Sequence, residues 1–211
     1  MHNEILNSSQ NDLLQLMSQF KREYYLVGGT AIALHIGHRR SIDFDMFKQS
    51  NINHKKNLDK IKNSGFDIMV TRHVQEQMNL MVNNVKITFF QYPFNIKASC
   101  KMESFFRLPT LLDLAAMKAY ALGRRSKWKD YVDLYFILKD HFGIESVIKR
   151  AEELFQELFS EKLFRSQLCY FDDVDYSEEV EYIIQNPPSI DEVKQGLISI
   201  ALSSTNQNTC N

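Results

Sequence analysis

The sequence contains few of the residues that mark unusual protein classes. Its 211 residues include only four prolines, seven glycines and three cysteines, which excludes fibrous, disordered and disulfide-rich proteins. The cysteines match no metal-binding or redox spacing and are therefore expected to be reduced thiols; they are Cys100, Cys169 and Cys210. Because 44% of the residues are hydrophobic, a chain of this length can bury a substantial core.

Long apolar runs and an excess of charge are also missing. No stretch of about 18 apolar residues occurs, and the N-terminus lacks the basic and apolar regions of a signal peptide. We therefore expect a cytoplasmic protein with no membrane partner. Lys and Arg (25) nearly balance Asp and Glu (26), which gives a formal net charge of -1. Nucleic-acid binding must then come from a local patch of positive charge.

The first half of the chain is rich in predicted strands. Apolar residues recur at helical spacing in residues 9–20, and residues 54–64 predict a polar, lysine-rich helix. A short helix is expected at residues 31–36, with Gly37 as its C-terminal cap. The pair Asn83-Asn84 predicts a tight hairpin turn, because asparagine tolerates a positive φ angle. Strands are predicted at residues 24–27, 41–47, 66–74, 78–82 and 85–90.

From Pro109 onward the pattern becomes helical. Helices are predicted at residues 110–123 and 126–143, in a long amphipathic stretch at 144–168, and from Ser189 onward. Ser189 and Glu192 have the spacing of a capping box. The tail at residues 204–211 is expected to be disordered. We predict two domains, residues 1–105 and residues 106–211.

Two acidic residues share one face of the strand predicted at 41–47. Side chains alternate along a strand, so Asp43 and Asp45 project together, while Ile42, Phe44 and Met46 form an apolar face. Like charges so close repel each other, and a divalent cation relieves the repulsion. Mg²⁺ is usually held by one or two carboxylates together with substrate phosphates, as phosphoryl and nucleotidyl transfer require. Taken alone, the pair is more typical of the solvated face of an edge strand, and the residues that precede it are what favour a metal site.

A glycine pair followed by a threonine precedes these acids. Gly28, Gly29 and Thr30 lie between a predicted strand and a short helix, where backbone N–H groups can approach phosphate oxygens. A plain tight turn is the alternative. Arg39 and Ser41 would share the face of the carboxylates in an extended chain, and Arg39 could pair with an acid or a phosphate.

The helical half contains a lysine within an apolar stripe. Lys118 follows Leu114 by four residues, so its ammonium must either extend past the stripe into solvent or meet a buried anion. Asp130 and Asp133 lie one turn apart on the next helix, a spacing also typical of solvated helices with surface ion pairs. Both interpretations stay open.

Two charged segments of the helical half also allow two interpretations. The loop GRRSKWK at residues 123–129 is either a phosphate or RNA contact zone or a solvated turn with Trp128 packed in the core. The acidic stretch at residues 171–179 is either a solvated loop or part of a pocket for a cationic substrate.

Taken together, these motifs resemble the AbiEii/AbiGii-type nucleotidyltransferase toxin family, a branch of the DNA polymerase β-like nucleotidyltransferase superfamily. The resemblance extends from about residue 24 to residue 140 and continues more weakly through the C-terminal helices. It rests on GGT at 28–30, R-x-S-x-D-x-D at 39–45, VKITFF-x-YPF at 85–94, and K-x(5)-R-x(4)-KD-x-x-DLYF with Lys118, Arg124, Lys129, Asp130 and Asp133.

The resemblance implies an α+β fold in which helices flank a mixed-sheet nucleotidyltransferase core and a helical C-terminal lobe follows. It also implies transfer of a nucleoside monophosphate from an NTP to an acceptor, such as a tRNA 3′ end, and an antitoxin partner. Asp43 and Asp45 would hold Mg²⁺ or Mn²⁺, and Gly28, Gly29, Thr30, Arg39 and Ser41 would bind the nucleotide. Lys118 would contact phosphate, and Asp130 would act near the acceptor or orient Lys118.

The sequence departs from the superfamily pattern at one important position. A third carboxylate is usual on the neighbouring strand, and here Thr88 occupies the expected place. A threonine contributes only a neutral oxygen and cannot serve as the usual base for an acceptor hydroxyl. Lys129 in place of an arginine is a smaller departure. A catalytically impaired nucleotide- or RNA-binding module is therefore an alternative hypothesis, and the acidic stretch at residues 171–179 keeps an aminoglycoside-type nucleotidyltransferase open as another.

Overall fold

The computed structural model describes residues 1–122 and 124–203. It divides into two compact units, residues 1–111 and the residues from 112 onward. The domain boundary expected after residue 105 falls inside a hairpin of the first unit and stays a prediction. The tail for which disorder is predicted, which includes Cys210, lies outside the described residues.

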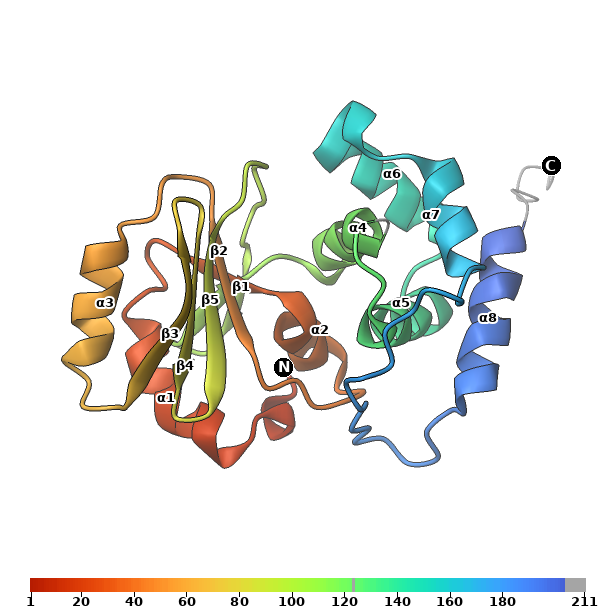
Figure 1. Ribbon diagram of the computed structural model, residues 1–211. Coiled ribbons are helices and arrows are strands. Elements are labelled where there is room, and N and C mark those ends of the chain that lie inside the picture. The colour runs from red at the N-terminus through yellow and green to blue at the C-terminus, as the bar shows by residue number, and fades with distance from the viewer. Residues whose placement is uncertain (123, 204–211) are drawn as a thin grey trace. The chain divides into compact units, whose positions relative to one another are not determined.

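A five-stranded sheet in the order β1-β2-β5-β4-β3 forms the centre of the first unit (Figure 1). Strands β2 and β5 are parallel, whereas the other neighbours are antiparallel, so the sheet is mixed. The strands are β1 (Tyr25–Val27), β2 (Phe44–Lys48), β3 (Ile68–Val74), β4 (Gln77–Val82) and β5 (Val85–Gln91). The expected α+β fold with a mixed sheet is confirmed.

Helices flank this sheet, and a short hairpin follows it. The helices are η1 (Asn3–Ile5), α1 (Ser8–Ser18), α2 (Gly28–Ile36) and α3 (His54–Lys62), and the hairpin is β6 (Cys100–Met102) with β7 (Phe106–Leu108). Figure 1 shows α3 beside one face of the sheet and α2 beside the other. Phe20, which follows α1, and Tyr24 pack against Phe89 of β5, with ring centroids 4.9 and 5.0 Å apart. The apolar face of the sheet is therefore the one toward α1 and α3.

The register of β2 and β5 determines which side chains share the opposite face. Phe44 pairs with Ile87 and is fully buried, whereas Asp45 pairs with Thr88 on the other face. β2 begins at Phe44, so Ile42 does not join the apolar face as expected and is 50% exposed. Asp43 and Asp45 nevertheless lie two residues apart where the chain enters the sheet.

The β4–β5 turn forms as the sequence predicts. Asn83 and Asn84 adopt φ angles of 50° and 60° between paired strands, the geometry of a tight hairpin. The predicted cap of the short helix is also confirmed, because Gly37 has a φ angle of 68° at the end of α2. That helix begins earlier than expected, at Gly28, so the glycine pair is its first turn.

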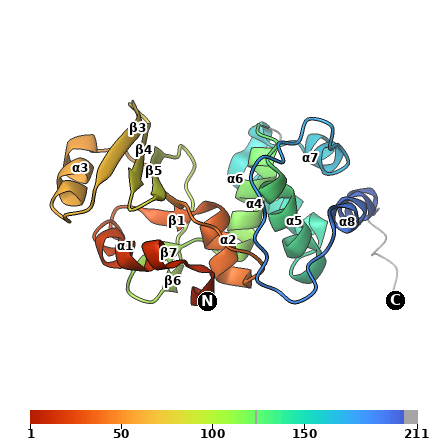
Figure 2. The ribbon, with the colours of Figure 1, turned by 60° about the horizontal axis from the view of Figure 1, so that its bottom comes forward.

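The second unit is helical. Its helices are α4 (Leu111–Leu122), α5 (Trp128–Asp140), α6 (Ile144–Phe155), η2 (Gln156–Leu158), α7 (Glu161–Leu168) and α8 (Ile190–Leu202). The amphipathic stretch at 144–168 is two helices, because Gln156 takes a φ angle of 50° and Ser160 caps α7. The capping box of Ser189 and Glu192 is confirmed. α8 packs closely on α5, where a Cβ on Gly196 would lie 2.5 Å from Tyr135 Cε2. Figure 2 labels both helices.

Within the described ranges, no helix combines the length and the apolar character needed to cross a membrane.

Candidate functional site

The two glycines at the start of α2 allow close approach of three polar side chains. Gly28 has a φ angle of +72°, and a Cβ built on it would lie 2.2 Å from Asp45 Oδ2. A Cβ on Gly29 would lie 2.7 Å from Arg39 Nη2 and 3.0 Å from Ser41 Oγ. Only glycine fits both positions without displacement. The first turn of α2 therefore adjoins Asp45, predicted to hold the metal ion, and Arg39 and Ser41, predicted to bind the nucleotide.

Thr30 fixes the segment that leads into β2. Its side chain is 1% exposed, and its hydroxyl lies 3.0 Å from Ser41 Oγ and within hydrogen-bond distance of the carbonyl oxygens of Ser41 and Asp43. The hydroxyl therefore holds the backbone of the carboxylate-bearing segment against α2. Thr30, which the sequence predicts to bind the nucleotide, thus fixes the backbone of Ser41 and Asp43 through its side-chain hydroxyl.

Gln10 also supports the segment that leads into β2, a role that was not predicted from the sequence. The residue is fully buried; its Nε2 donates to the Ser41 carbonyl at 2.9 Å, and its Oε1 accepts from Asn7 N at 3.1 Å. The Asn7–Gln10 spacing indicates a capping box, which the structure contains. That spacing gives no sign of the second bond to Ser41, which depends on how α1 packs.

The carboxylates face a cation and a neutral hydroxyl. Asp43 is 39% exposed at its side chain, and Lys86 Nζ lies 3.9 Å from its Oδ2. Thr88, 7% exposed, is the β5 partner of Asp45 and occupies the position where a third carboxylate is usual. Asp45 thus lies at the N-terminus of α2, where the helix dipole favours negative charge, and Asp43 lies two residues before it.

Chemically, these residues fit a hard divalent cation shared with a substrate. Among the described residues, no group of three or more His, Cys, Asp or Glu side chains could hold a metal ion by itself. Two carboxylates suffice for Mg²⁺ when substrate phosphates and water complete its shell. The residues present therefore suit a cation that binds together with a phosphorylated substrate.

The close contact between Gly28 and Asp45 can be tested by substituting the glycine. Gly28→Ala is expected to destabilise the protein more than Gly65→Ala, although both residues have positive φ angles, +72° and +79°. At Gly65 nothing lies within 4 Å of the added Cβ, so the strain of about 1–2 kcal/mol is purely conformational. At Gly28 the Cβ would also displace Asp45. Urea unfolding of both variants measures the difference, and equal losses would contradict the described contact.

The second unit contains a buried charge cluster built on α4 and α5. Lys118 is 5% exposed, and its Nζ lies 2.7 Å from Asp130 Oδ1 and 3.0 Å from Asp133 Oδ2. Arg125 donates to both oxygens of Asp130, at 2.8 and 3.2 Å. Both carboxylates are buried. Lys118 therefore meets buried anions, and the interpretation of Asp130 and Asp133 as a solvated surface pair is wrong.

The basic loop before α5 contacts the acidic stretch that follows α7. Trp128 is 5% exposed and lies against Tyr131 and Tyr176, so it packs in the core of the unit. Lys127 and Lys129 both pair with Glu178. The hydrogen bond from Lys127 lowers the pKa of the Glu178 carboxyl. Part of the positive charge of the loop is therefore neutralised within the unit.

Comparison with known proteins adds evidence independent of this geometry. A family model described as "Nucleotidyl transferase AbiEii toxin, Type IV TA system" matches residues 12–196. An uncharacterized protein of Aquifex aeolicus (strain VF5) is 25% identical over 176 residues, which cover 75% of this chain and 83% of that protein.

Two solved structures share the fold. MenT4, a nucleotidyltransferase toxin from Mycobacterium tuberculosis H37Rv, superposes with a TM-score of 0.61 at 14% identity, covering 92% of this chain and 80% of its own. JHP933 from Helicobacter pylori gives a TM-score of 0.58 at 19% identity, covering 92% and 88%.

Proposed function

The chain belongs to the AbiEii nucleotidyltransferase toxin family, and from this we propose that it transfers a nucleoside monophosphate from an NTP to an RNA acceptor, with release of pyrophosphate. The observation that carries the proposal is the approach of Asp45 to Gly28, which places one of the two acids at the N-terminus of a helix. That N-terminus offers N–H groups to phosphate oxygens, and the acids supply ligands for a cation.

The NTP would bind along the first turn of α2. Gly28 and Gly29 let phosphate oxygens approach the backbone closely, and Arg39, next to Gly29, supplies positive charge. Thr30 and Ser41 keep the segment before β2 in place through their mutual hydrogen bond. A triphosphate held in this way would be positioned for attack by the acceptor at its α-phosphorus.

Asp43 and Asp45 would hold the divalent cation, Mg²⁺ or Mn²⁺. When bound, the cation neutralises charge on the attacking and leaving oxygens. Asp45 would hold it from the face of the sheet that it shares with Thr88, and Asp43, two residues earlier, would supply the second carboxylate. Thr88 cannot take a proton from the acceptor at neutral pH, so its role is limited to hydrogen bonding.

The roles that we propose for Lys118 and Asp130 come from the family motif. The ammonium of Lys118 is held between two buried carboxylates, which supports a role for Asp130 in orienting Lys118. We assign Lys118 to phosphate contact and Asp133 to holding it in position. We also propose that the protein acts in the cytoplasm and binds an antitoxin.

A specific observation favours a second candidate function. Because Thr88 stands beside Asp45 where a third carboxylate is usual, the same site could bind nucleotide or RNA without transferring anything. A small-molecule acceptor of the aminoglycoside type is the other alternative.

One experiment separates these candidates. Purified protein is incubated with Mg²⁺ and each α-labelled NTP in turn, with and without total RNA. Label in RNA supports the proposal, and label in a small molecule supports the aminoglycoside-type alternative. Calorimetric NTP binding with no labelled product under any condition supports the binding module.

A further inference from the structure

A hollow in the first unit collects polar groups that the proposed reaction does not use. It has a volume of about 530 Å³ and lies beside the starts of β1 and β7 and the end of β2. Its lining includes Glu23, Tyr25, Lys48, Ser50 and Arg107. Tyr25 is the register partner of Phe47, and Val27 that of Asp45, so about 7 Å of strand separates the hollow from the acidic pair.

Tyr25 brings a buried hydroxyl that has no hydrogen-bond partner. The residue is 7% exposed, and its Oη is one of the few buried polar side-chain atoms of the described residues without an acceptor or donor. Buried polar groups are normally satisfied, because leaving one unpaired costs stability. Burial also raises the pKa of this hydroxyl, against a smaller opposing effect of Arg107, so it remains a donor.

Lys48 brings a nearly buried cation to the same hollow. It is 6% exposed, and the one carboxylate within ion-pair distance in the described part of the chain, Glu23, lies 3.7 Å away, which is too long for a hydrogen bond. The ring of Tyr24 lies 4.7 Å from Lys48 Nζ. Burial lowers the pKa of Lys48, and Glu23 partly offsets this. The buried ammonium therefore has an ion pair at 3.7 Å but no carboxylate at hydrogen-bond distance among the described residues.

Arg107 completes the donor set. Its Nε donates to the Lys21 carbonyl at 2.7 Å and its Nη2 to the Arg22 carbonyl at 3.4 Å, which fixes the guanidinium at the hollow. A guanidinium carries five N–H groups, so donors remain for a ligand. The lining contains one acid, Glu23, and that carboxylate is bonded by Lys56 of α3 at 2.6 Å. The charged side chains that line the hollow therefore carry a net positive charge.

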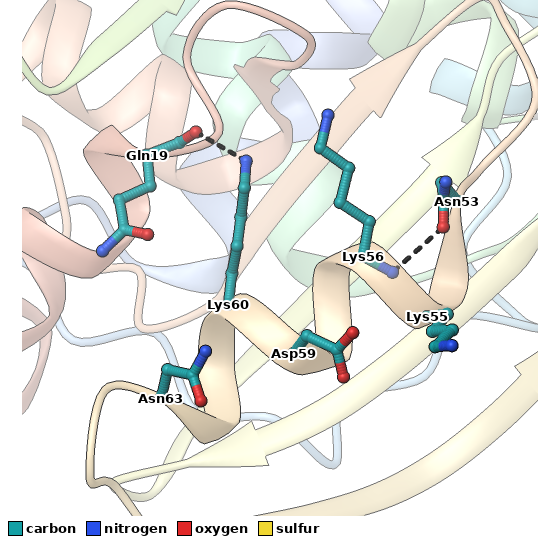
Figure 3. Close-up of a pocket in the computed structure, with 7 residues that line it drawn as sticks. All are labelled: Gln19, Asn53, Lys55, Lys56, Asp59, Lys60 and Asn63. Carbon is teal, nitrogen blue, oxygen red and sulfur yellow. Dashed lines mark hydrogen bonds between the residues drawn. The ribbon is translucent and has the colours of Figure 1, made fainter.

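A neighbouring hollow on α3 lacks these features. It measures about 420 Å³ and is lined by Lys55, Lys56 and Lys60 among others (Figure 3). Lys60 donates to the Gln19 carbonyl at 3.0 Å, and Lys56 is bonded to Glu23. Its lysines are exposed or partly exposed, and they already have partners or contact solvent. We therefore place no ligand there.

We propose that the hollow lined by Tyr25, Lys48 and Arg107 is an oxyanion site that binds a phosphate group. All three residues line the hollow, and hydroxyl, ammonium and guanidinium groups are the donors that bind phosphate oxygens, the charge-assisted bonds being the strong ones. A free phosphate and a phosphate within an RNA chain present the same oxygens. The site is separate from the acidic pair, so it does not depend on nucleotidyl transfer.

The test is calorimetric titration of the full chain with inorganic phosphate, without NTP or divalent metal. Wild-type protein is expected to bind, and Tyr25→Phe is expected to bind about tenfold more weakly, because a hydrogen bond to a charged group is lost. Tyr24→Phe is the matched control: it removes a hydroxyl bonded to Asn57 at 2.8 Å, outside the hollow, and should bind phosphate as wild type does. Tyr25→Phe should also unfold no earlier than wild type without ligand.

A second arm identifies the source of the phosphate. If a short single-stranded RNA binds more tightly than phosphate and phosphate displaces it, the ligand is an RNA phosphate; if RNA leaves phosphate binding unchanged, the ligand is free phosphate. Both results support the site. Lys48→Met, expected to abolish binding, provides an independent variant. The proposal is overturned if wild-type protein binds neither ligand, or if Tyr25→Phe and Tyr24→Phe bind phosphate equally well.

Discussion

Asp45→Asn is expected to slow nucleotide transfer at least about a thousandfold and to abolish growth inhibition by the expressed protein. The change keeps the shape of the side chain beside Gly28 but removes one of the two charges that would hold the cation. A thousandfold loss corresponds to about 4 kcal/mol of barrier, the size expected for losing metal-based charge stabilisation. Asp43→Ala is expected to have the same effect. Labelled-NTP turnover and colony counts after induction measure both.

The control is Asp59→Asn, which neutralises an exposed acid on α3 of the same unit. It should leave transfer and growth inhibition unchanged. Thermal unfolding should show that the Asp43 and Asp45 variants remain folded. Growth inhibition that persists in folded Asp43→Ala would contradict the assignment of the acidic pair.

Lys118→Met is expected to destabilise the protein by about 3–5 kcal/mol, because it removes one partner of a buried ion cluster. Asp130 would retain Arg125, with bonds of 2.8 and 3.2 Å, but Asp133 is fully buried and would lose the ammonium 3.0 Å away. Denaturant unfolding of the single variant gives the value.

The double variant Lys118→Met/Asp133→Leu is expected to recover part of that stability, since it removes a buried carboxylate together with the cation that lies 3.0 Å from it. Lys127→Met is the surface control. Its ion pair with Glu178 is 41% and 47% exposed at the two side chains, so the loss should stay below about 1 kcal/mol. A Lys118→Met variant as stable as Lys127→Met would contradict the buried cluster.

Local signals in the sequence were sufficient for many elements of the fold. The Asn83-Asn84 turn, the Gly37 cap and the Ser189 capping box all depend on the φ preferences or hydrogen bonds of a few adjacent residues. The pairing of Asp45 with Thr88 also follows the expected strand period. The break at Gln156 was missed, because the amphipathic pattern continues across it and no glycine or proline marks it.

Features that depend on packing could not be predicted in the same way. Lys118 between two carboxylates and Gln10 on the Ser41 carbonyl each join different elements, and the unpaired Tyr25 hydroxyl is buried by the packing of its surroundings. A lysine in an apolar stripe has the same pattern whether it ends in solvent or at a buried anion. The family motif, rather than periodicity, favoured the buried outcome.

The central claim, transfer of a nucleoside monophosphate, is tested most directly by following two labels of one NTP. The protein is incubated with Mg²⁺, total RNA and NTP labelled at the α-phosphate in one sample and at the γ-phosphate in another. We expect the α-label in RNA and the γ-label in released pyrophosphate. A γ-label in RNA, or no label in RNA from either sample, would contradict it.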